Sequence, residues 1–454
     1  MTRILVLPGL YDSGSAHWQS VWERSDPRFV RVVQRDWATP ARGDWVTTLD
    51  GAVSAAVAAG EDVVLVAHST ACPLVAFWAQ SGARTRRVRG ALLVAPSDTE
   101  GPNYPAGPTG WQPMPLARLP FPSIVVASSD DMYCTLDRAR AFAAAWQSRF
   151  VGVGPAGHIN GDSGLGAWPA GRALLDELLL DPRRRRFRQL HESGCFVIPN
   201  PWNAGTARLL ASLGFPALAT TSSGYAWSIG RSDNRVSRDE ILAHLRTIAA
   251  AVDLPVNADF EGGFATMPAD VAANVSLATH TDIAGLSIED STGDAASPLY
   301  DATLAVERIV AARAAIDDSR TGILLTARSE GFVVDRPDLA ETVRRLTAFA
   351  EAGADCLYAP GIRTREEIAA VVSAVSPKPV NVLVGSGFTT VADLAALGVR
   401  RISIGGALAR AAWTGVLGAA REMATHGTFA QLGGTVSGDE MDQLFAHASE
   451  HVRE

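Results

Sequence analysis

At 454 residues the chain is too long for one hydrophobic core, because single cores stop growing at about 250–300 residues, so we expect two or three folded units. Hydrophobic residues make up 47% and charged residues 19%, which is typical of a globular protein and excludes a disordered chain. The formal net charge of −8 excludes a general basic field for nucleic acid.

The compartment can also be predicted. The first residues, MTRILVLPGL, form a strand-like run with a glycine turn and do not resemble a secretory signal. No apolar run approaches the roughly 18 residues that a membrane span needs, so we expect no membrane partner. The four cysteines are scattered without a CxxC pair, which favours reduced thiols and a cytoplasmic protein: Cys72, Cys134, Cys195 and Cys356.

The first region, residues 1–180, alternates short apolar runs with helical patterns. The runs end at Gly, Ser, Pro, Asp or His and cover 4–9, 62–69, 90–96, 123–130 and 150–158. Helical patterns cover 48–60 and 136–147. Continuous apolar strands that alternate with helices predict a parallel sheet covered on both faces. The stretch 97–122, rich in proline and glycine, predicts a loop rather than a helical lid.

Residues 181–188, DPRRRRFR, are predicted to be the linker between this α/β region and a second one at 189–454. Their basic cluster, Arg183 to Arg186, is interpreted as a solvated linker or a helix start rather than a phosphate site.

From residue 189 the strand–helix alternation restarts and completes eight rounds. The predicted strands are 195–200, 217–222, 255–260, 285–290, 322–330, 356–360, 379–384 and 401–406. The helical patterns between them repeat apolar residues at intervals of three and four, which gives each helix one face to bury. Eight such units in about 240 residues predict a closed (β/α)8 TIM-type barrel.

In the first region, Ser69 follows an apolar strand and precedes a helical pattern. A nucleophile elbow needs small residues two positions before and after the serine, and Ala67 and Ala71 stand there. The backbone N–H of Thr70 and one near Leu10 are predicted to form an oxyanion hole.

The candidate partners of Ser69 follow two later strands. Asp131 follows the predicted strand at 123–129 and His158 the predicted strand at 150–154, so the chain order is serine, acid, histidine, as in α/β hydrolases. His158 would take the proton of Ser69, and Asp131 would orient the imidazole. Asp130 remains an alternative acid, while His17 and His68 are expected to be structural or to face substrate.

Residues 1–180 resemble the small YdeN-like serine hydrolases, the group that includes retinoblastoma-binding protein nine. The motifs that carry the resemblance are LPGLYDSGSAHWQ, VAHSTACPLVAFWA, LLVAPSD, IVVASSDDMY and AGHINGDSGLG. The resemblance implies a lidless hydrolase of small esters, amides or acyl groups that needs no cofactor.

In the second region, acidic residues follow two successive strands. Asp259 and Glu261 are two apart, so alternation would point both toward the barrel mouth, and Glu289 and Asp290 end the next strand. Carboxylates on neighbouring strand ends suit Mg²⁺, which takes few protein oxygens and keeps several waters.

Further polar residues end other strands of the barrel. Arg328, with Glu330, follows the fifth strand and could bind a substrate carboxylate. Ser223, Gly224 and Tyr225 follow the second strand, where small residues could bring backbone N–H groups to an anion.

Residues 187–454 resemble the isocitrate lyase and phosphoenolpyruvate mutase superfamily. The matching stretches are IPNPWNAGTARLL, ALATTSSGYAWSIG, VNADFEGGFA, GLSIEDS, LTARSEGF and RRISIGGALARAA. The resemblance implies cleavage or formation of a C–C or C–P bond beside a 2-oxo acid, and a homo-oligomer built through the barrel domain. Carried over by position, it implies Mg²⁺ ligands at Asp259, Glu261 and Glu289, with Asp233 as the acid after the second strand. It also implies an oxoacid carboxylate site at Ser223, Gly224 and Tyr225, and a substrate-binding arginine at Arg328.

The loop after the fourth barrel strand departs from this superfamily. In the lyases it holds a catalytic cysteine and in the mutase a lysine, but here it is STGDAASPLYD, and Lys378, the chain's only lysine, precedes the seventh strand. A decarboxylase or hydrolase of an oxaloacetate-like acid needs neither group. We therefore favour a decarboxylase or hydrolase of this kind for the second region. Together with the serine hydrolase of the first region, this predicts a bifunctional enzyme with small-molecule substrates. The alternatives are a phosphonate-related mutase or hydrolase, a (methyl)isocitrate lyase-like enzyme, or a catalytically degenerate binding or assembly module.

Overall fold

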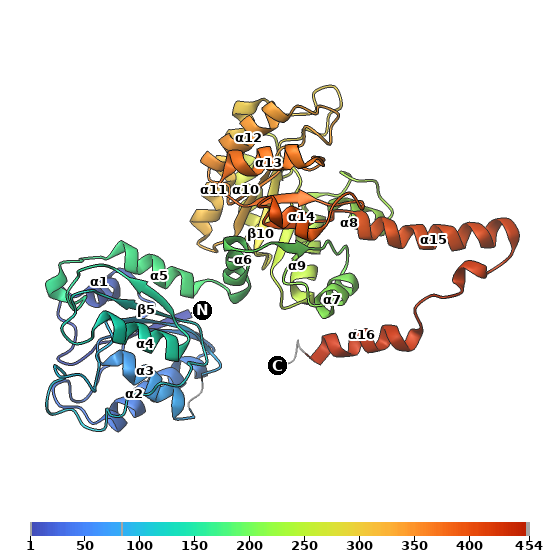
Figure 1. Ribbon diagram of the computed structural model, residues 1–454. Helices are drawn as coiled ribbons and strands as arrows, with labels where there is room; N and C mark the ends of the chain where they lie inside the picture. The colour runs from blue at the N-terminus through green and yellow to red at the C-terminus, as the bar shows by residue number, and fades with distance from the viewer. Residues whose placement is uncertain (1, 83–84, 451–454) are drawn as a thin grey trace. The chain divides into compact units, whose positions relative to one another are not determined.

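The computed structural model describes residues 2–82 and 85–450 (Figure 1). The chain folds as two compact units, and the boundary along the chain lies between Leu180 and Asp181. Both units alternate parallel strands with helices, so the predicted α/β class is confirmed.

The first unit is built on a six-stranded parallel sheet with the order β2-β1-β3-β4-β5-β6. Its strands are β1 (Thr2–Leu7), β2 (Phe29–Arg31), β3 (Asp62–His68), β4 (Val88–Val94), β5 (Ser123–Ala127) and β6 (Arg149–Gly152). Because all six run in the same direction, the carboxyl ends of β3, β5 and β6 lie along one edge, where ligands bind in open α/β sheets.

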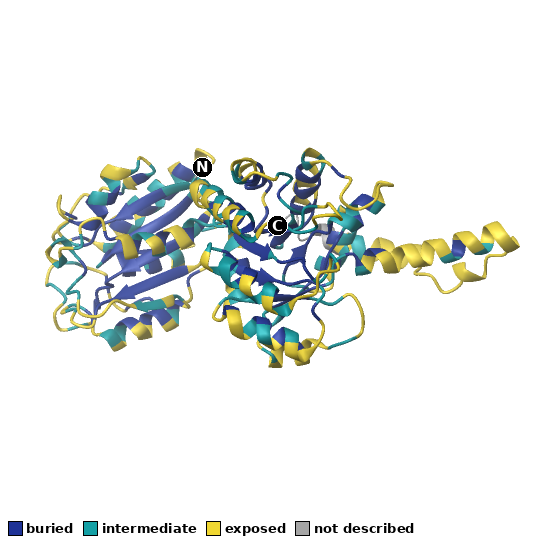
Figure 2. Cartoon of the chain, turned by 90° about the horizontal axis from the view of Figure 1, so that it is seen from above, coloured by how far each residue is buried: buried dark blue, intermediate teal, exposed yellow. Residues whose placement is uncertain are grey.

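Helices cover both faces of this sheet, and the covering follows the alternation of the strands (Figure 2). On one face Ile4 and Val6 pack with α1 (Trp18–Ser25) and α5 (Pro169–Leu179). On the other, Leu5 and Leu7 pack with α2 (Arg42–Ala58), α3 (Ala71–Gln80) and α4 (Leu136–Trp146). Two apolar cores on a doubly covered sheet explain why the strands are continuously apolar.

The stretch 97–122 contains neither helix nor strand, as predicted. It is nevertheless packed, because Trp111, Met114, Leu119 and Phe121 are buried in the core beside α2, α3 and α4. The loop is therefore held in place by the burial of its apolar side chains. Elsewhere in this unit, the short 3-10 turn η1 (Gly161–Ser163) follows the last strand, β6.

The second unit is a barrel of eight parallel strands with the order β7-β14-β13-β12-β11-β10-β9-β8. The strands are β7 (Phe196–Ile198), β8 (Leu218–Ala219), β9 (Val256–Asp259), β10 (Gly285–Glu289), β11 (Leu324–Arg328), β12 (Cys356–Tyr358), β13 (Val380–Leu383) and β14 (Arg401–Ser403). The seam between β7 and β8 is closed by Ala219 N, which donates to Pro199 O at 3.0 Å, and by Asn200 Nδ2, which donates to Thr220 O at 2.8 Å.

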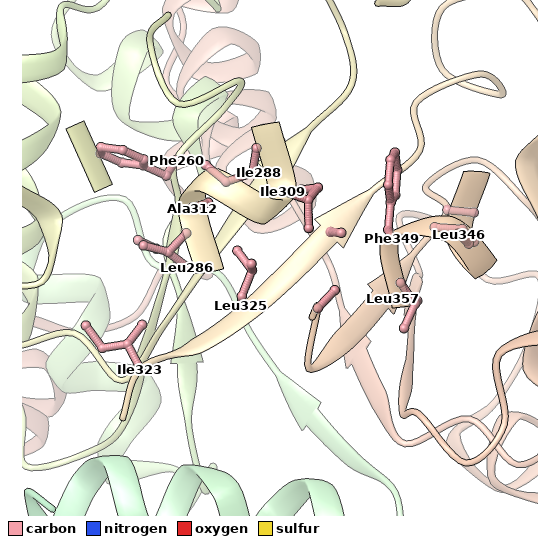
Figure 3. Packing of buried hydrophobic residues seen from close by; sticks show 14 of the residues in the cluster. Phe260, Leu286, Ile288, Ile309, Ala312, Ile323, Leu325, Leu346, Phe349 and Leu357 are labelled. Atoms are coloured by element: carbon pink, nitrogen blue, oxygen red, sulfur yellow. The ribbon is translucent and has the colours of Figure 1, made fainter. Parts of the chain in front are cut away.

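Helices surround the barrel and bury one face each against the strands. They are α7 (Ala204–Ser212), α8 (Ser222–Ser228), α9 (Arg238–Ala251), α10 (Pro268–Ala278), α11 (Ala302–Ser319), α12 (Leu339–Glu351), α13 (Arg365–Val375) and α14 (Val391–Ala396). Figure 3 shows part of this core, in which Leu286 and Leu325 of adjacent strands lie beside Ile309 of α11. Each of these three side chains is at most 2% exposed, so the strand ends are held on a rigid frame.

Residues 181–188 do not form a separate linker, which corrects that prediction, but the alternative of a helix start for Arg183 to Arg186 agrees with the structure. They belong to helix α6 (Pro182–Glu192), which Asp181 caps by accepting from Arg183 N. Phe187 is fully buried among strand residues of the barrel, and Arg184 Nε donates to Ile283 O at 2.9 Å. Arg184 and Arg188 thus donate to carbonyl groups that precede β10 and β11, so α6 is attached to the barrel.

The chain continues past the barrel as α15 (Ala407–His426), a 3-10 turn η2 (Ala430–Leu432) and α16 (Gly438–Glu450). Helix α15 is mostly exposed (Figure 2), and only Ala409 and Ala419 are buried in it. In the ranges that the structure describes, no helix combines the length and apolar character needed to cross a membrane.

Candidate active sites

Ser69 lies at the sharp turn between β3 and α3. Its backbone is left-handed, with φ at 60°, as expected where a nucleophile is raised above a sheet edge. Ala67 and Ala71 are fully buried, so larger side chains would not fit on either side of it. Gly9 approaches so closely that a Cβ atom added there would lie 2.6 Å from Ser69 Cβ. The role of Gly9 was not predicted from the sequence, although the Pro8-Gly9 turn after the first strand could have indicated it.

The structure brings Asp131 and His158 to Ser69. His158 Nδ1 lies 2.8 Å from Asp131 Oδ2, and Nε2 lies 2.8 Å from Ser69 Oγ. The side chain of Asp131 is only 3% exposed and that of His158 11%, so the contact with the acid is shielded from water. A carboxylate facing Nδ1 keeps the proton on that nitrogen, which leaves Nε2 free to accept the hydroxyl proton of Ser69.

Asp130, the alternative acid, lies elsewhere. Its Oδ1 accepts hydrogen bonds from Ala156 N at 2.9 Å, Gly157 N at 2.8 Å and Ser128 Oγ at 2.6 Å. The hydrogen bonds from Ser128 and from the backbone lower the pKa of Asp130. Asp130 therefore holds the loop that carries His158, while Asp131 contacts the imidazole itself.

A cavity of about 540 Å³ opens beside Ser69. Leu10 and Thr70, predicted to supply oxyanion-hole N–H groups, both line it, although their role stays a prediction. His17 and His68 also line it. His68 Nε2 contacts His158 O at 2.9 Å, and burial lowers the pKa of His68. His17 Nδ1 accepts from Gln19 N, and burial lowers its pKa to about 4, so both rings are neutral near pH 7.

In the barrel, Arg328 at the end of β11 makes three ion pairs. Nη1 lies 2.8 Å from Asp259 Oδ1, Nη2 lies 3.2 Å from Glu289 Oε2, and Nε lies 2.8 Å from Glu330 Oε1. Its guanidinium also lies over the ring of Tyr358 at 5.2 Å. Arg328 is thus fixed by protein carboxylates from three strand ends before any substrate binds.

Glu261 does not follow the predicted alternation, because β9 ends at Asp259 and Glu261 has a left-handed backbone with φ at 46°. Its Oε1 is buried without a hydrogen-bond partner. Burial, followed by the nearby charges of Asp259 and Asp233, raises the pKa of Glu261 to about 8. The protein therefore buries this carboxyl oxygen without a partner that would stabilise its charged form.

The carboxylates here outnumber the cations. Burial raises the pKa of Glu289 well above its usual range, and it also raises that of Glu330. Asp233 lies on the cavity wall beyond α8, and desolvation together with Asp259 raises its pKa. Within residues 2–82 and 85–450, however, no three acidic, histidine or cysteine side chains are arranged to enclose a metal ion by themselves.

Of the predicted anion site at Ser223, Gly224 and Tyr225, only one residue faces the cavity of the barrel. These residues lie in the first turn of α8, where Gly224 N donates to the capping hydroxyl of Thr221. The ring of Tyr225 stacks on His244 at 3.8 Å. Ser223, together with Asp259, Arg328 and Asp233, lines a cavity of about 260 Å³, whereas Gly224 and Tyr225 do not.

Asp290 follows the last residue of β10 and does not join its neighbour Glu289 at Arg328. It pairs with Arg345 at 3.1 Å and accepts from Glu330 N at 2.8 Å. The sequence reading also missed Arg308, which donates to Gly262 O, to Ala265 O at 3.0 Å and to Glu289 O at 3.4 Å. It thereby holds the loop that carries Glu261.

Comparison with known proteins agrees with this division. Residues 187–424 match the family described as phosphoenolpyruvate phosphomutase. The chain belongs to the phosphoenolpyruvate phosphomutase family. Residues 4–177 match the family described as serine hydrolase, so a serine hydrolase domain precedes the barrel. The predicted combination of a hydrolase fold and a TIM-type barrel is confirmed.

Relatives of the barrel are found among curated proteins. An uncharacterized protein of Mycobacterium tuberculosis is 34% identical over 222 residues, which cover 48% of this chain and 81% of the relative. An oxaloacetate decarboxylase of Paraburkholderia xenovorans is 29% identical over 239 residues, which cover 50% of this chain and 76% of the relative.

Solved structures resemble the same unit. A lyase/mutase from Burkholderia cenocepacia J2315 is 50% identical, with a TM-score of 0.57, and the match covers 58% of this chain and 96% of that one. A phosphonopyruvate hydrolase in complex with oxalate and Mg²⁺ is 26% identical, with a TM-score of 0.53, and the match covers 59% of this chain and 96% of that one.

Proposed function

We propose that the first unit hydrolyses small esters, amides or acyl groups through Ser69, His158 and Asp131. The observation that carries the proposal is the unbroken contact from Asp131 through His158 to Ser69 Oγ. Ser69 Oγ attacks the carbonyl carbon, His158 takes the proton and returns it to the leaving group, and water then releases the acyl group by the same route. The cavity of about 540 Å³ has the volume of a small-molecule site, so we expect a small substrate.

A fluorophosphonate probe tests this proposal, because it reacts with activated serines. Wild-type protein should be labelled, and Ser69→Ala should not. Ser97 and Ser128 are further buried serines of the same unit, so retained labelling of Ser69→Ala would assign the reaction to another residue and refute the proposal.

For the barrel, we propose Mg²⁺-dependent cleavage of a C–C bond in an oxaloacetate-like 2-oxo acid. The observation that carries the proposal is the group of buried carboxylates around Arg328, in which one guanidinium faces three carboxylates. Burial and the neighbouring carboxylates raise the pKa of Glu261 and of Glu289, so a divalent cation at this place would stabilise their charged forms and would also offset their repulsion of an anionic substrate.

The residues fit Mg²⁺ by their chemistry. Asp259, Glu261 and Glu289 offer hard oxygen ligands, and Glu261 Oε1 is buried and unpartnered. Since three side chains do not enclose an ion by themselves, water would complete the coordination, which Mg²⁺ favours. When bound, the ion would supply Lewis-acid stabilisation of the negative charge that develops on the oxo acid.

The remaining steps fall to residues of the chain. Ser223 and Asp233 line the cavity and would orient the substrate, and Arg328 would oppose the developing negative charge. The C–C bond to the departing carboxylate breaks, CO₂ leaves, and the electron pair of that bond stays on the remaining 2-oxo acid. A proton from water then adds to that carbon and completes the product. The loop 291–301 contains neither cysteine nor lysine, and decarboxylation requires neither. The relative named oxaloacetate decarboxylase supports this choice of reaction.

The barrel is tested by pyruvate release from oxaloacetate with and without Mg²⁺, corrected for the uncatalysed reaction, in wild type and Asp259→Asn. A parallel melting experiment uses Mg²⁺ with oxalate, because ligands of the folded state raise its melting temperature. Turnover and protection in wild type, lost in Asp259→Asn, are expected. Protection without turnover would indicate a binding module, and the absence of both would refute the proposal.

A further inference from the structure

Ser97 follows β4 and contacts the proposed nucleophile. Its Oγ lies 2.9 Å from Ser69 Oγ, and its backbone N–H donates to Ser69 O at 3.4 Å. Ser97 is 3% exposed and lines the same cavity as Ser69 and His158. Two independent contacts therefore hold this residue against the elbow.

The direction of the hydroxyl hydrogen bond follows from the proton on His158. Asp131 faces Nδ1, which therefore keeps its proton, so Nε2 must accept and the hydroxyl of Ser69 must donate to it. A hydroxyl has one proton, which leaves Ser69 Oγ able only to accept from Ser97. Ser97 is thus a donor aimed at the atom that attacks the substrate.

We propose that Ser97 is a fourth catalytic residue of the hydrolase site, a proposal that rests on the serine hydrolase function proposed above. As His158 removes the proton of Ser69, negative charge grows on Oγ and the hydrogen bond from Ser97 strengthens, because charge-assisted bonds are the stronger ones. Oγ then forms its bond to the acyl carbon while the leaving group departs with the proton from His158. Ser97 keeps its own proton throughout.

The same donor acts in the second half of the reaction. Water adds to the acyl carbon as His158 takes its proton, and the bond from that carbon to Ser69 Oγ breaks. The electron pair returns to Oγ, where Ser97 again donates to the developing charge until His158 delivers the proton. Ser97 therefore assists both steps without being consumed in either.

A second buried serine pair offers a matched control. Ser123 Oγ lies 2.6 Å from Ser148 Oγ, and Ser123 is 6% exposed. Ser123 begins β5, at the opposite end of the sheet from Ser69. Ser123→Ala thus removes the same type of contact from the same sheet without touching the nucleophile.

The experiment measures fluorophosphonate labelling rates and kcat and KM for p-nitrophenyl acetate in wild type, Ser97→Ala, Ser97→Thr and Ser123→Ala. Ser97→Ala should lower the labelling rate and kcat by about 10- to 100-fold, as expected when one hydrogen bond to a charged group is lost, with KM within about twofold. Ser97→Thr should recover most of the rate, and Ser123→Ala should equal wild type.

Wild-type rates in Ser97→Ala would overturn the role of Ser97 while leaving Ser69 as the nucleophile. Equal losses in Ser97→Ala and Ser123→Ala, with parallel falls in melting temperature, would show a structural role and also overturn it. If Ser97→Ala does not fold, Ser97→Cys takes its place, because a thiol fills similar space but donates weakly. A wild-type protein that is not labelled would instead refute the proposed hydrolase function.

Discussion

His158 Nε2 lies 2.8 Å from Ser69 Oγ although 89 residues separate them along the chain. The contact exists because β3 and β6 run parallel in one sheet, so the residues that follow their carboxyl ends share an edge. Asp130 and Asp131 follow β5 at the same edge, and the consecutive acids take different tasks there.

Replacing Asp131 by Asn should lower kcat/KM for ester hydrolysis by about 10⁴-fold, because an amide no longer holds the imidazole in the required tautomer. Asp130→Asn should cost less than about tenfold, because the amide oxygen can still accept from Ala156 N or Gly157 N. Steady-state kinetics on both variants decides the matter, and a larger loss in Asp130→Asn would contradict the assignment.

Gly9→Ala should disturb the nucleophile elbow, because the added Cβ would lie 2.6 Å from Ser69 Cβ. We expect a loss of about 1–3 kcal/mol in the free energy of unfolding from overpacking. Labelling should also slow by at least about tenfold, since a small shift of the nucleophile is costly. Urea unfolding and labelling rates provide the measurements.

Gly51→Ala is the matched control for Gly9→Ala. Gly51 lies in the middle of α2 with nothing within 4 Å of an added Cβ. The Gly51→Ala variant should gain about 0.5–1 kcal/mol in the free energy of unfolding, because alanine is the better helix former, and it should keep the wild-type labelling rate. Equal effects of the two substitutions would argue against crowding at Ser69.

Glu261→Gln should stabilise the metal-free protein at alkaline pH. The pKa of Glu261 is raised to about 8 in the fold, above its ordinary value near 4.5, so the unfolded chain loses this proton first. Stability should therefore fall as pH rises from about 4.5 to about 8, and glutamine should remove that part of the slope. Urea unfolding in EDTA at pH 5 and pH 8 measures it, and a variant advantage that is the same at both pH values would contradict the prediction.

The barrel should form a homo-oligomer through α15. Val416 is 57% exposed and Leu417 47%, and such a run of apolar side chains on one helix is expected to be covered by another copy. Val416→Asp should lower the mass measured by light scattering. Val310→Asp, on α11 and 50% exposed, should leave it unchanged. A monomeric wild type would refute the idea.

The predicted strands and the barrel were recoverable from sequence because local periodicity reflects burial, which the fold then uses. The helix start in the run 181–188 was predicted, but the linker was not borne out, because four arginines suggest solvation whereas carbonyls distant in the chain accept from Arg184. Likewise, Tyr225 belongs to the sequence stretch that resembles an oxoacid carboxylate site, but its ring stacks on His244 of another helix.

The amino-acid sequence by itself determined two α/β units, the order of Ser69, Asp131 and His158, and the placing of acids at barrel strand ends, because each depends on local pattern. Only the tertiary structure decided that Asp131 rather than Asp130 contacts the imidazole, that Ser97 contacts Ser69, and that Arg328 is held by three carboxylates. Those contacts depend on the directions in which side chains point once distant strands have come together in a sheet or barrel. The spacing of residues along the chain does not determine those directions.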